Sequence, residues 1–336
     1  MLRSLDQGHS NAVIWCDPGY APLAEAVVAL MGHAVSVTAV GGPASQGVDA
    51  LARSLGVEAT DDPRQLLLDA SADSVLLLTC DPPLERELLA SVCEQAALLT
   101  LEPLAADVRR AAELGLGGEP GEKKHVAGER VISVPQFTES PGYRRATDAE
   151  QAIGVARGLS IESIGRAGRG SLFARLYDAW VTVLGFVDLP LSIDASLAGA
   201  VDPRDELRRV AGTLSAHART AEEATVTLIA SDRGGHDARR LEALGDAAHL
   251  TVNDASYTLL DLEGEPIDRH EGDGQPTTVA DLVADQWRRT LERGGAGPTA
   301  VPPPRRVSAL ACCEACLLSA RTGQPESPRR VLEMAW

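Results

Sequence analysis

The chain has 336 residues, enough to bury a large core and to form two domains of ordinary size. Its 48 acidic residues outnumber its 31 basic residues, and the formal charge of -17 would repel phosphate backbones and anionic lipid surfaces. We therefore expect no nucleic-acid partner and no membrane partner. The N-terminus lacks the apolar run of a signal peptide, and no segment approaches the roughly 20 apolar residues of a membrane span. This composition predicts a cytoplasmic protein.

The first hundred residues alternate between buried strands and amphipathic helices. The apolar pattern predicts strands at 11–17, 34–42, 73–83 and 97–103, and helices at 22–33, 48–57, 61–70 and 84–96. Strands that are apolar throughout and separated by helices are typical of a parallel sheet covered on both faces. After a further helix at 105–114, a last strand is predicted at 131–137. The sequence thus predicts a doubly wound βαβ domain over residues 1–130.

The pattern changes after this point to short segments that alternate apolar and polar residues between turn signals. Such alternation is typical of an antiparallel sheet with one face in water. Near the C-terminus, residues 281–295 have helical periodicity, and a final helix at about 307–322 is closed by Gly323. We therefore predict a mostly antiparallel α+β domain over residues 131–336.

Three stretches carry a resemblance to a known family, namely 48–79, 239–266 and 316–325. Together with the order of the elements, they resemble the Gfo/Idh/MocA oxidoreductases, the family of glucose-fructose oxidoreductase and inositol dehydrogenase. The resemblance implies a Rossmann-like NAD(P)-binding-type domain followed by an α+β domain, with a small-molecule ligand in the cleft between the two domains. The implied activity is that of an NAD(P)-dependent dehydrogenase of a sugar, a cyclitol or a related small polyol.

The positions that correspond to the family's cofactor site depart from its pattern. Family members hold the pyrophosphate on a Gly-rich turn after the first strand, but this turn reads WCDPGYAPLAE, with Gly19 as its one glycine. Asp17 would place a negative charge against a phosphate. The acidic residue expected to bind the ribose falls at or near Gly42, and Thr79 is the remaining cofactor-site equivalent. We therefore expect a degenerate NAD(P) site.

The family's catalytic lysine is also replaced. Its Glu-Lys-Pro turn supplies a lysine beside the nicotinamide, whereas the corresponding turn here is Leu101-Glu102-Pro103. A carboxylate does not replace an ammonium group as a proton donor. The chain has two lysines, Lys123 and Lys124, both in a charged, Gly-rich segment that is predicted to be a surface loop.

The second catalytic element of the family is an Asp-x-x-x-His pattern on a helix, which falls here within residues 170–185. An ungapped alignment puts Ala174 at the acid and Asp178 at the histidine. If activity persists, Asp178 or Tyr177 is the candidate acid-base group. The same region contributes arginines and aromatic residues that either bind an anionic ligand such as a sugar acid or form structural contacts; the set is Tyr143, Arg144, Arg145, Arg166, Arg169, Arg175, Tyr177, Asp178 and Trp180.

Three cysteines, Cys312, Cys313 and Cys316, lie on the predicted last helix with the spacing of a zinc half-site. A partner half-site is not evident, so small apolar side chains packed in a core explain them better.

Three hypotheses follow. The preferred one is a catalytically degenerate pseudoenzyme that acts as a binding or structural subunit and forms a homo-oligomer through the open face of its C-terminal sheet. The alternative is an active dehydrogenase with a divergent site. The third is a metal-linked assembly module built on the cysteines.

Overall fold

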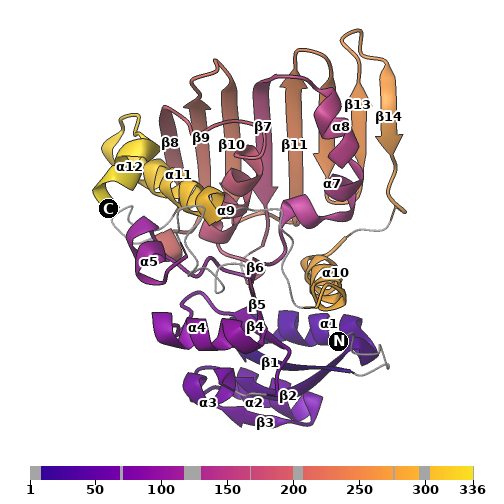
Figure 1. Cartoon of the computed structure of the whole chain (residues 1–336), viewed down its shortest axis with the longest axis vertical. Helices are drawn as coiled ribbons and strands as arrows, with labels where there is room; N and C mark the ends of the chain where they lie inside the picture. The colour runs from indigo at the N-terminus through magenta and orange to yellow at the C-terminus, as the bar shows by residue number, and fades with distance from the viewer. Residues whose placement is uncertain are drawn as a thin grey trace. The chain divides into compact units, whose positions relative to one another are not determined.

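The computed structural model describes residues 9–68, 71–116, 130–166, 168–199, 207–274, 277–294 and 303–335. The chain divides into two compact units (Figure 1). The N-terminal unit comprises 1–101, 124–134 and 280–298, and the C-terminal unit comprises 102–123, 135–279 and 299–336. This division differs from a single boundary at residue 130 in three places, the first being that 131–134 belong to the N-terminal unit. Residues 102–123 belong to the C-terminal unit, and 280–298 return to the N-terminal unit.

The N-terminal unit contains the predicted parallel sheet. Its described strands are β1 (Ser10–Cys16), β2 (Val35–Gly41), β3 (Glu58–Thr60), β4 (Ser74–Leu78), β5 (Ala97–Thr100) and β6 (Val131–Ser133). They lie in the order β3-β2-β1-β4-β5-β6, and every neighbouring pair is parallel. All residues of β4 and β5 are buried, which agrees with their uninterrupted apolar sequence. The predicted doubly wound topology is confirmed, and β3 is a short strand that the pattern did not indicate.

The helices of this unit begin and end near the predicted signals. They are α1 (Ala21–Met31), α2 (Gln46–Leu55), α3 (Pro63–Leu67), α4 (Arg86–Gln95) and α10 (Val279–Glu292), with short 3-10 turns η1 (Pro18–Tyr20) and η2 (Gly32–Ala34). The Asp62 carboxylate accepts hydrogen bonds from the main-chain N–H groups of Arg64 and Gln65 and so caps α3, as its position before Pro63 predicted. Gly56 ends α2 with a φ of 70°.

Helix α10 belongs to the N-terminal unit although it follows most of the C-terminal unit in sequence. Trp287, fully buried, donates from Nε1 to Ser74 Oγ over 3.1 Å. Gln286 donates from Nε2 to the Ser133 carbonyl oxygen over 3.0 Å. These contacts join α10 to β4 and β6. The amphipathic pattern of 281–295 predicts a helix with one buried face, but such a pattern does not identify the sheet that covers it.

The C-terminal unit contains a second sheet in the order β14-β13-β12-β11-β7-β10-β9-β8 (Figure 1). Its described strands are β7 (Ala156–Ile164), β8 (Ser192–Ala198), β9 (Thr213–Arg219), β10 (Thr225–Ser231), β11 (Ala238–Gly245), β12 (His249–Asn253), β13 (Tyr257–Leu260) and β14 (Pro266–His270). All described neighbours are antiparallel except β7 and β10, which are parallel. The predicted mostly antiparallel α+β architecture is confirmed.

One face of this sheet is covered by helices. The described helical segments are α5 (Val108–Glu113), η3 (Phe137–Glu139), α7 (Pro141–Arg145), α8 (Thr147–Ala152), α9 (Leu172–Val183), η4 (Leu207–Arg209), α11 (Pro303–Thr322) and α12 (Pro328–Ala335). Helix α9 packs on β7 and β10, and α11 packs on α9 and β8. Gly323 closes α11 with a φ of 65°, as predicted. The expectation that this helix begins near 307 and is the last one is wrong, because α11 begins at Pro303 and α12 follows it.

The strand predicted at 131–137 is also shorter than expected, since β6 ends at Ser133 and the chain turns into η3. In the described part of the chain, every helix is too short or too polar to cross a lipid bilayer.

Candidate functional site

The turn after β1 is held by Asp17 rather than left open. The Thr79 hydroxyl donates to Asp17 Oδ1 over 2.9 Å, and the Cys80 main-chain N–H donates to Oδ2 over 2.9 Å. The Asp17 N–H in turn donates to the Leu78 carbonyl oxygen over 2.9 Å. Thr79 is buried and also accepts from the Asp81 N–H. Asp17 and Thr79, two cofactor-site equivalents, therefore bond to each other and tie the end of β1 to the end of β4.

Other side chains occupy the same end of the sheet. Tyr20, 5% exposed, places its hydroxyl 3.5 Å from Cys80 Sγ. Gly19 is exposed and has a φ in the ordinary range, and a Cβ on it would meet no atom within 4 Å. Gly19 therefore does not mark the tight backbone approach for which the family's turn uses glycine.

Gly42 follows β2 at the position of the family's ribose-binding acid, and it has no room for a side chain. A Cβ on Gly42 would lie 2.1 Å from the Cys16 carbonyl oxygen and 3.0 Å from Val48 Cγ2. Together, the Asp17 carboxylate and the close packing at Gly42 do not fit the groups with which a Rossmann turn binds pyrophosphate and ribose.

Glu102, the residue at the family's lysine position, is buried with 2% exposure. Its Oε1 accepts from the Ser171 main-chain N–H over 2.8 Å, and its Oε2 accepts from the Ser171 hydroxyl over 2.5 Å. Ser171 is the N-cap of α9, and its Oγ accepts from the Ala174 N–H over 3.0 Å. A carboxylate at this end of a helix is stabilised by the helix dipole. Glu102 therefore supports the start of α9, an interaction that a lysine ammonium could not make.

The residues after Glu102 are also held by the C-terminal unit. Arg208 donates from Nη2 to the carbonyl oxygens of Pro103, over 3.0 Å, and Leu104, over 2.7 Å. Glu314 on α11 accepts from the Val108 N–H at the start of α5 over 2.6 Å. Burial raises the pKa of the Glu314 carboxyl to about 7, which the Val108 N–H opposes. Pro103, the last residue of the substituted turn, thus has its carbonyl oxygen in a structural contact.

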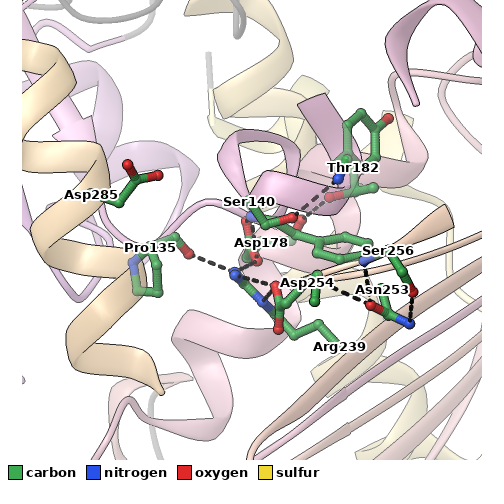
Figure 2. A network of polar contacts seen from close by, with 12 residues as sticks. Pro135, Ser140, Asp178, Thr182, Arg239, Asn253, Asp254, Ser256 and Asp285 are labelled. Atoms are coloured by element: carbon green, nitrogen blue, oxygen red, sulfur yellow. Dashed lines mark hydrogen bonds and ion pairs between the residues drawn. The ribbon is translucent and has the colours of Figure 1, made fainter. Parts of the chain in front are cut away.

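Asp178, which aligns with the family's catalytic histidine, lies in a buried ionic network (Figure 2). Its Oδ1 accepts from the Phe137 N–H over 3.0 Å, and its Oδ2 accepts from Arg239 Nη1 over 3.0 Å. Arg239 also donates to Asp254 Oδ1 from Nε, over 2.9 Å, and from Nη2, over 2.7 Å. Its Nη1 reaches the Pro135 carbonyl oxygen over 2.8 Å. One guanidinium thus joins α9, β11 and the segment between β6 and η3.

The burial of this network perturbs its charges. Burial raises the pKa of the Asp178 carboxyl, while Arg239 and the Phe137 N–H oppose that rise. Burial lowers the pKa of Arg239, but Asp254 and Asp178 outweigh it and raise this pKa above its ordinary value. The guanidinium therefore stays charged. Tyr177, the other acid-base candidate, is 7% exposed, and burial raises the pKa of its hydroxyl. Ala174 supplies no acid.

Two arginines of the expected anion site, Arg169 and Arg175, pair with Asp237. Arg169 Nη1 lies 3.2 Å from Asp237 Oδ2, and Arg175 Nη2 lies 3.4 Å from Oδ1. The main-chain N–H of Arg166 donates to the same Oδ1 over 3.1 Å, while its Nε donates to the Gly235 carbonyl oxygen over 2.7 Å. Arg175 lies directly on Gly165, where a Cβ would be 1.9 Å from its Nη2. These contacts favour a structural role for Arg175.

The cysteines of α11 are fully buried, and all six cysteines are free thiols. Burial raises the pKa of Cys316 to about 12 and raises those of Cys312 and Cys313 well above their ordinary value. Among the residues that the structure describes, no group of three or more metal-binding side chains is arranged around a common point. Lys123 and Lys124 lie outside the described residues.

Sequence reasoning missed Arg239, Asp254 and Ser171 as partners of the site. One signal for Arg239 was present, because it shares its strand face with Leu241 and Ala243, both buried. An arginine on the inward face of a strand requires a buried acidic partner. The partner itself was not visible, since Asp178 is 61 residues away in sequence.

Comparisons with known proteins show similarity in structure alone. No family model matches the chain, and no curated protein matches it. A UDP-N-acetylglucosamine 3-dehydrogenase from Acidithiobacillus ferrooxidans has 14% identity and a TM-score of 0.66, covering 94% of this chain and 99% of that one. Levoglucosan dehydrogenase in complex with NADH and levoglucosan has 12% identity and a TM-score of 0.69, covering 95% and 99%. A myo-inositol dehydrogenase from Corynebacterium glutamicum has 16% identity and a TM-score of 0.64, also covering 95% and 99%.

These neighbours are dehydrogenases of the Gfo/Idh/MocA type, so the fold that the sequence resemblance implied is confirmed. At 12–16% identity, the similarity establishes the fold and leaves the activity of this chain open.

Proposed function

We propose that this chain, which has the fold of the Gfo/Idh/MocA dehydrogenases, has lost nicotinamide-dependent catalysis and acts as a binding or structural subunit. The observation that carries the proposal is the position of Glu102. Both of its carboxylate oxygens bond to Ser171 at the start of α9, and its side chain is buried. The position of the family's proton-donating lysine is thus used to hold a helix.

Two further positions support the same proposal. Asp17 uses both carboxylate oxygens to join β1 to β4, where a phosphate would require N–H donors and no negative charge. Asp178 is paired with Arg239, whose positive charge favours the ionised carboxylate and would oppose its uptake of a proton as a general base. Each of these three positions now has a structural partner. This is expected if selection for catalysis had ended while selection for folding continued.

A turnover assay tests the proposal. The purified protein would be incubated with NAD⁺ or NADP⁺ and with myo-inositol, levoglucosan or UDP-N-acetylglucosamine, and reduced nicotinamide would be followed by absorbance. We expect no rate above that of a heat-inactivated sample, whereas a dehydrogenase of this fold run in parallel turns over its own substrate. A reproducible rate that depends on both cofactor and substrate would refute the proposal.

The alternative function is an active dehydrogenase with a divergent site. Its support is the nature of the neighbours, several of which are described as complexes with NADH or NAD, together with the raised pKa of Asp178. If turnover is found, Asp178→Asn should abolish it when Asp178 is the acid-base group. Tyr177→Phe should abolish it when Tyr177 has that role. A small-molecule ligand of the cleft between the domains stays a prediction.

We also propose that the chain forms a homo-oligomer through the face of the C-terminal sheet that points away from α9 and α11. This face presents small hydroxyl side chains and isoleucines, namely Ser160, Ile164, Ser215, Thr227, Ile229 and Thr251, interspersed with the charged side chains of Glu162, Arg240 and Glu242. Ser196 and Ser215 already pair across it over 2.8 Å. A face of this kind can pair with the same face of a second copy about a two-fold axis. Light scattering after size exclusion should give at least a dimer, and Ile229→Glu should yield monomer, while the exposed control Leu68→Glu should not.

A further inference from the structure

A pocket lies within the C-terminal unit, where α8, the start of β7 and the turn after α9 meet. Its volume is about 340 Å³, within the range of small-ligand sites. It is lined by Thr147, Glu150, Gln151, Ile153, Gly154, Ala156, Gly185 and Phe186. These residues all belong to one unit, so the pocket does not depend on how the two units are placed.

One charged side chain lines this pocket, and a side chain of opposite charge lies beside its wall. Glu150 lies in its wall, half-buried, and burial raises the pKa of its carboxyl while Arg305 opposes the rise. Arg305, near the start of α11, lies beside Gly185 of the wall, since a Cβ on Gly185 would be 3.8 Å from Arg305 Nη1. Within the described part of the chain, neither charged group has a hydrogen-bond or ion-pair partner. They influence each other electrostatically but do not form a salt bridge.

The rest of the wall is rigid and partly apolar. Ile153 and Ala156 are buried, and Phe186, which follows α9, is half-buried. Gly154 has a φ of +74°, and a Cβ on it would lie 2.1 Å from Asp246 Oδ1. Asp246 Oδ1 accepts from the Val155 N–H over 2.9 Å, which fixes the turn between α8 and β7. The turn is therefore pre-formed, and a ligand would not have to order it.

We propose that this pocket binds a free α-amino acid with an apolar side chain, whose ammonium group pairs with Glu150 and whose carboxylate pairs with Arg305. A zwitterion of this kind inserts between two charges of opposite sign that lie too far apart to pair directly. The apolar side chain packs against Ile153, Ala156 and Phe186. Bidentate contact with a carboxylate is the geometry that a guanidinium favours.

The charge pattern distinguishes this ligand from others. A simple anion would meet the Glu150 carboxylate, and a simple amine would meet Arg305, so each would gain one charge contact and suffer one repulsion. A neutral sugar would leave the guanidinium with no carboxylate partner. Binding of an amino acid here is independent of the proposed loss of dehydrogenase activity, and separate experiments test each proposal.

Isothermal titration of the full chain with L-leucine, L-valine and L-phenylalanine tests the proposal. We expect at least one to bind with a dissociation constant below about 1 mM. For leucine, the matched analogues are 4-methylpentanoate, which lacks the ammonium group, and 3-methylbutylamine, which lacks the carboxylate. Each analogue should bind at least tenfold more weakly than leucine. Silence of all three amino acids at about 10 mM would overturn the proposal.

Two variants and two controls locate the binding. Glu150→Gln and Arg305→Gln should each weaken the bound amino acid at least tenfold, with unchanged circular dichroism and thermal melting. Asp148→Asn on α8 and Arg321→Gln on α11 change exposed charges on the same helices and should leave affinity unchanged. Equal affinity in wild type and both pocket variants would also overturn the proposal, because binding would then occur elsewhere.

Discussion

Asp17, Glu102 and Asp178 each accept a hydrogen bond from a main-chain N–H at the end of a secondary-structure element. The donors are Cys80 after β4, Ser171 at the start of α9 and Phe137 at the start of η3. Main-chain N–H groups at such ends have no partner within their own element, and leaving them buried without one is costly. The three carboxylates are therefore tied to folding whatever ligand the protein binds.

Glu102 gives the sharpest residue-level prediction. Glu102→Gln keeps an acceptor for Ser171 and should cost roughly 1 kcal/mol of unfolding free energy. Glu102→Lys, which restores the family's residue, places an ammonium group against the Ser171 N–H and the positive end of α9. We expect it to cost at least roughly 2–3 kcal/mol more than Glu102→Gln.

Urea unfolding followed by circular dichroism measures this difference, with exposed Glu222→Lys as the matched charge reversal. Equal stability of Glu102→Lys and wild type would mean that the carboxylate does not support α9.

The ion pair of Asp178 and Arg239 gives a second prediction. Asp178→Ala removes one partner of a buried arginine and the acceptor of the Phe137 N–H, and should cost about 3 kcal/mol. Adding Arg239→Met to this variant should recover part of the loss, because the buried guanidinium that lacks a counter-charge is then removed. A double-mutant cycle of unfolding free energies checks the coupling, and strictly additive losses would contradict the network.

The replacement of lysine by Glu102 and the alignment of Asp178 could be read from the sequence, because each sits in a recognisable stretch. What these carboxylates bind could not, since Ser171 and Arg239 are 69 and 61 residues away from them. Local patterns identify buried and exposed positions, and long-range partners are fixed by the tertiary fold.

Helices α5 and α11 are joined by the Glu314 carboxylate, which accepts from the Val108 N–H. Burial raises the Glu314 pKa from 4.5 to about 7, with Asp107 adding to the rise. A carboxyl whose pKa is higher in the folded than in the unfolded state favours folding while it is protonated. This contribution is complete below about pH 4.5 and is lost as pH rises through about 7.

Glu314→Gln should therefore be more stable relative to wild type at pH 8 than at pH 5, by up to roughly 3 kcal/mol. Unfolding free energies of both proteins across this range give the measurement. The exposed variant Glu113→Gln on α5 should show no comparable pH-dependent gain. A constant difference between Glu314→Gln and wild type from pH 5 to pH 8 would contradict the raised pKa.

Most elements could be predicted because their patterns are local. The caps Asp62, Gly56 and Gly323 lie where the sequence placed them. Two features were not local. Helix α10 returns to the first unit through Trp287, and α12 follows a turn after Gly323 that the sequence pattern had marked as the end of the last helix.

At the scale of the whole molecule, a net charge of -17 opposes the proposed self-association. Salt screens the repulsion between two copies, because the Debye length falls from about 30 Å at 0.01 M to about 8 Å at 0.15 M ionic strength. We therefore expect the oligomer to be favoured by salt. Sedimentation velocity at these two ionic strengths should show more of the larger species at the higher one, and the opposite trend would argue for an interface built on ion pairs.

The loss of cofactor binding is the central claim, and a titration with NADH and NADPH tests it most directly. Nicotinamide fluorescence and thermal unfolding would be followed together in the same samples, with a dehydrogenase of this fold as the positive control. We predict no change in either signal at up to about 1 mM nucleotide. Binding tighter than roughly 100 μM, with the rise in stability that mass action then requires, would contradict the claim and restore the active dehydrogenase.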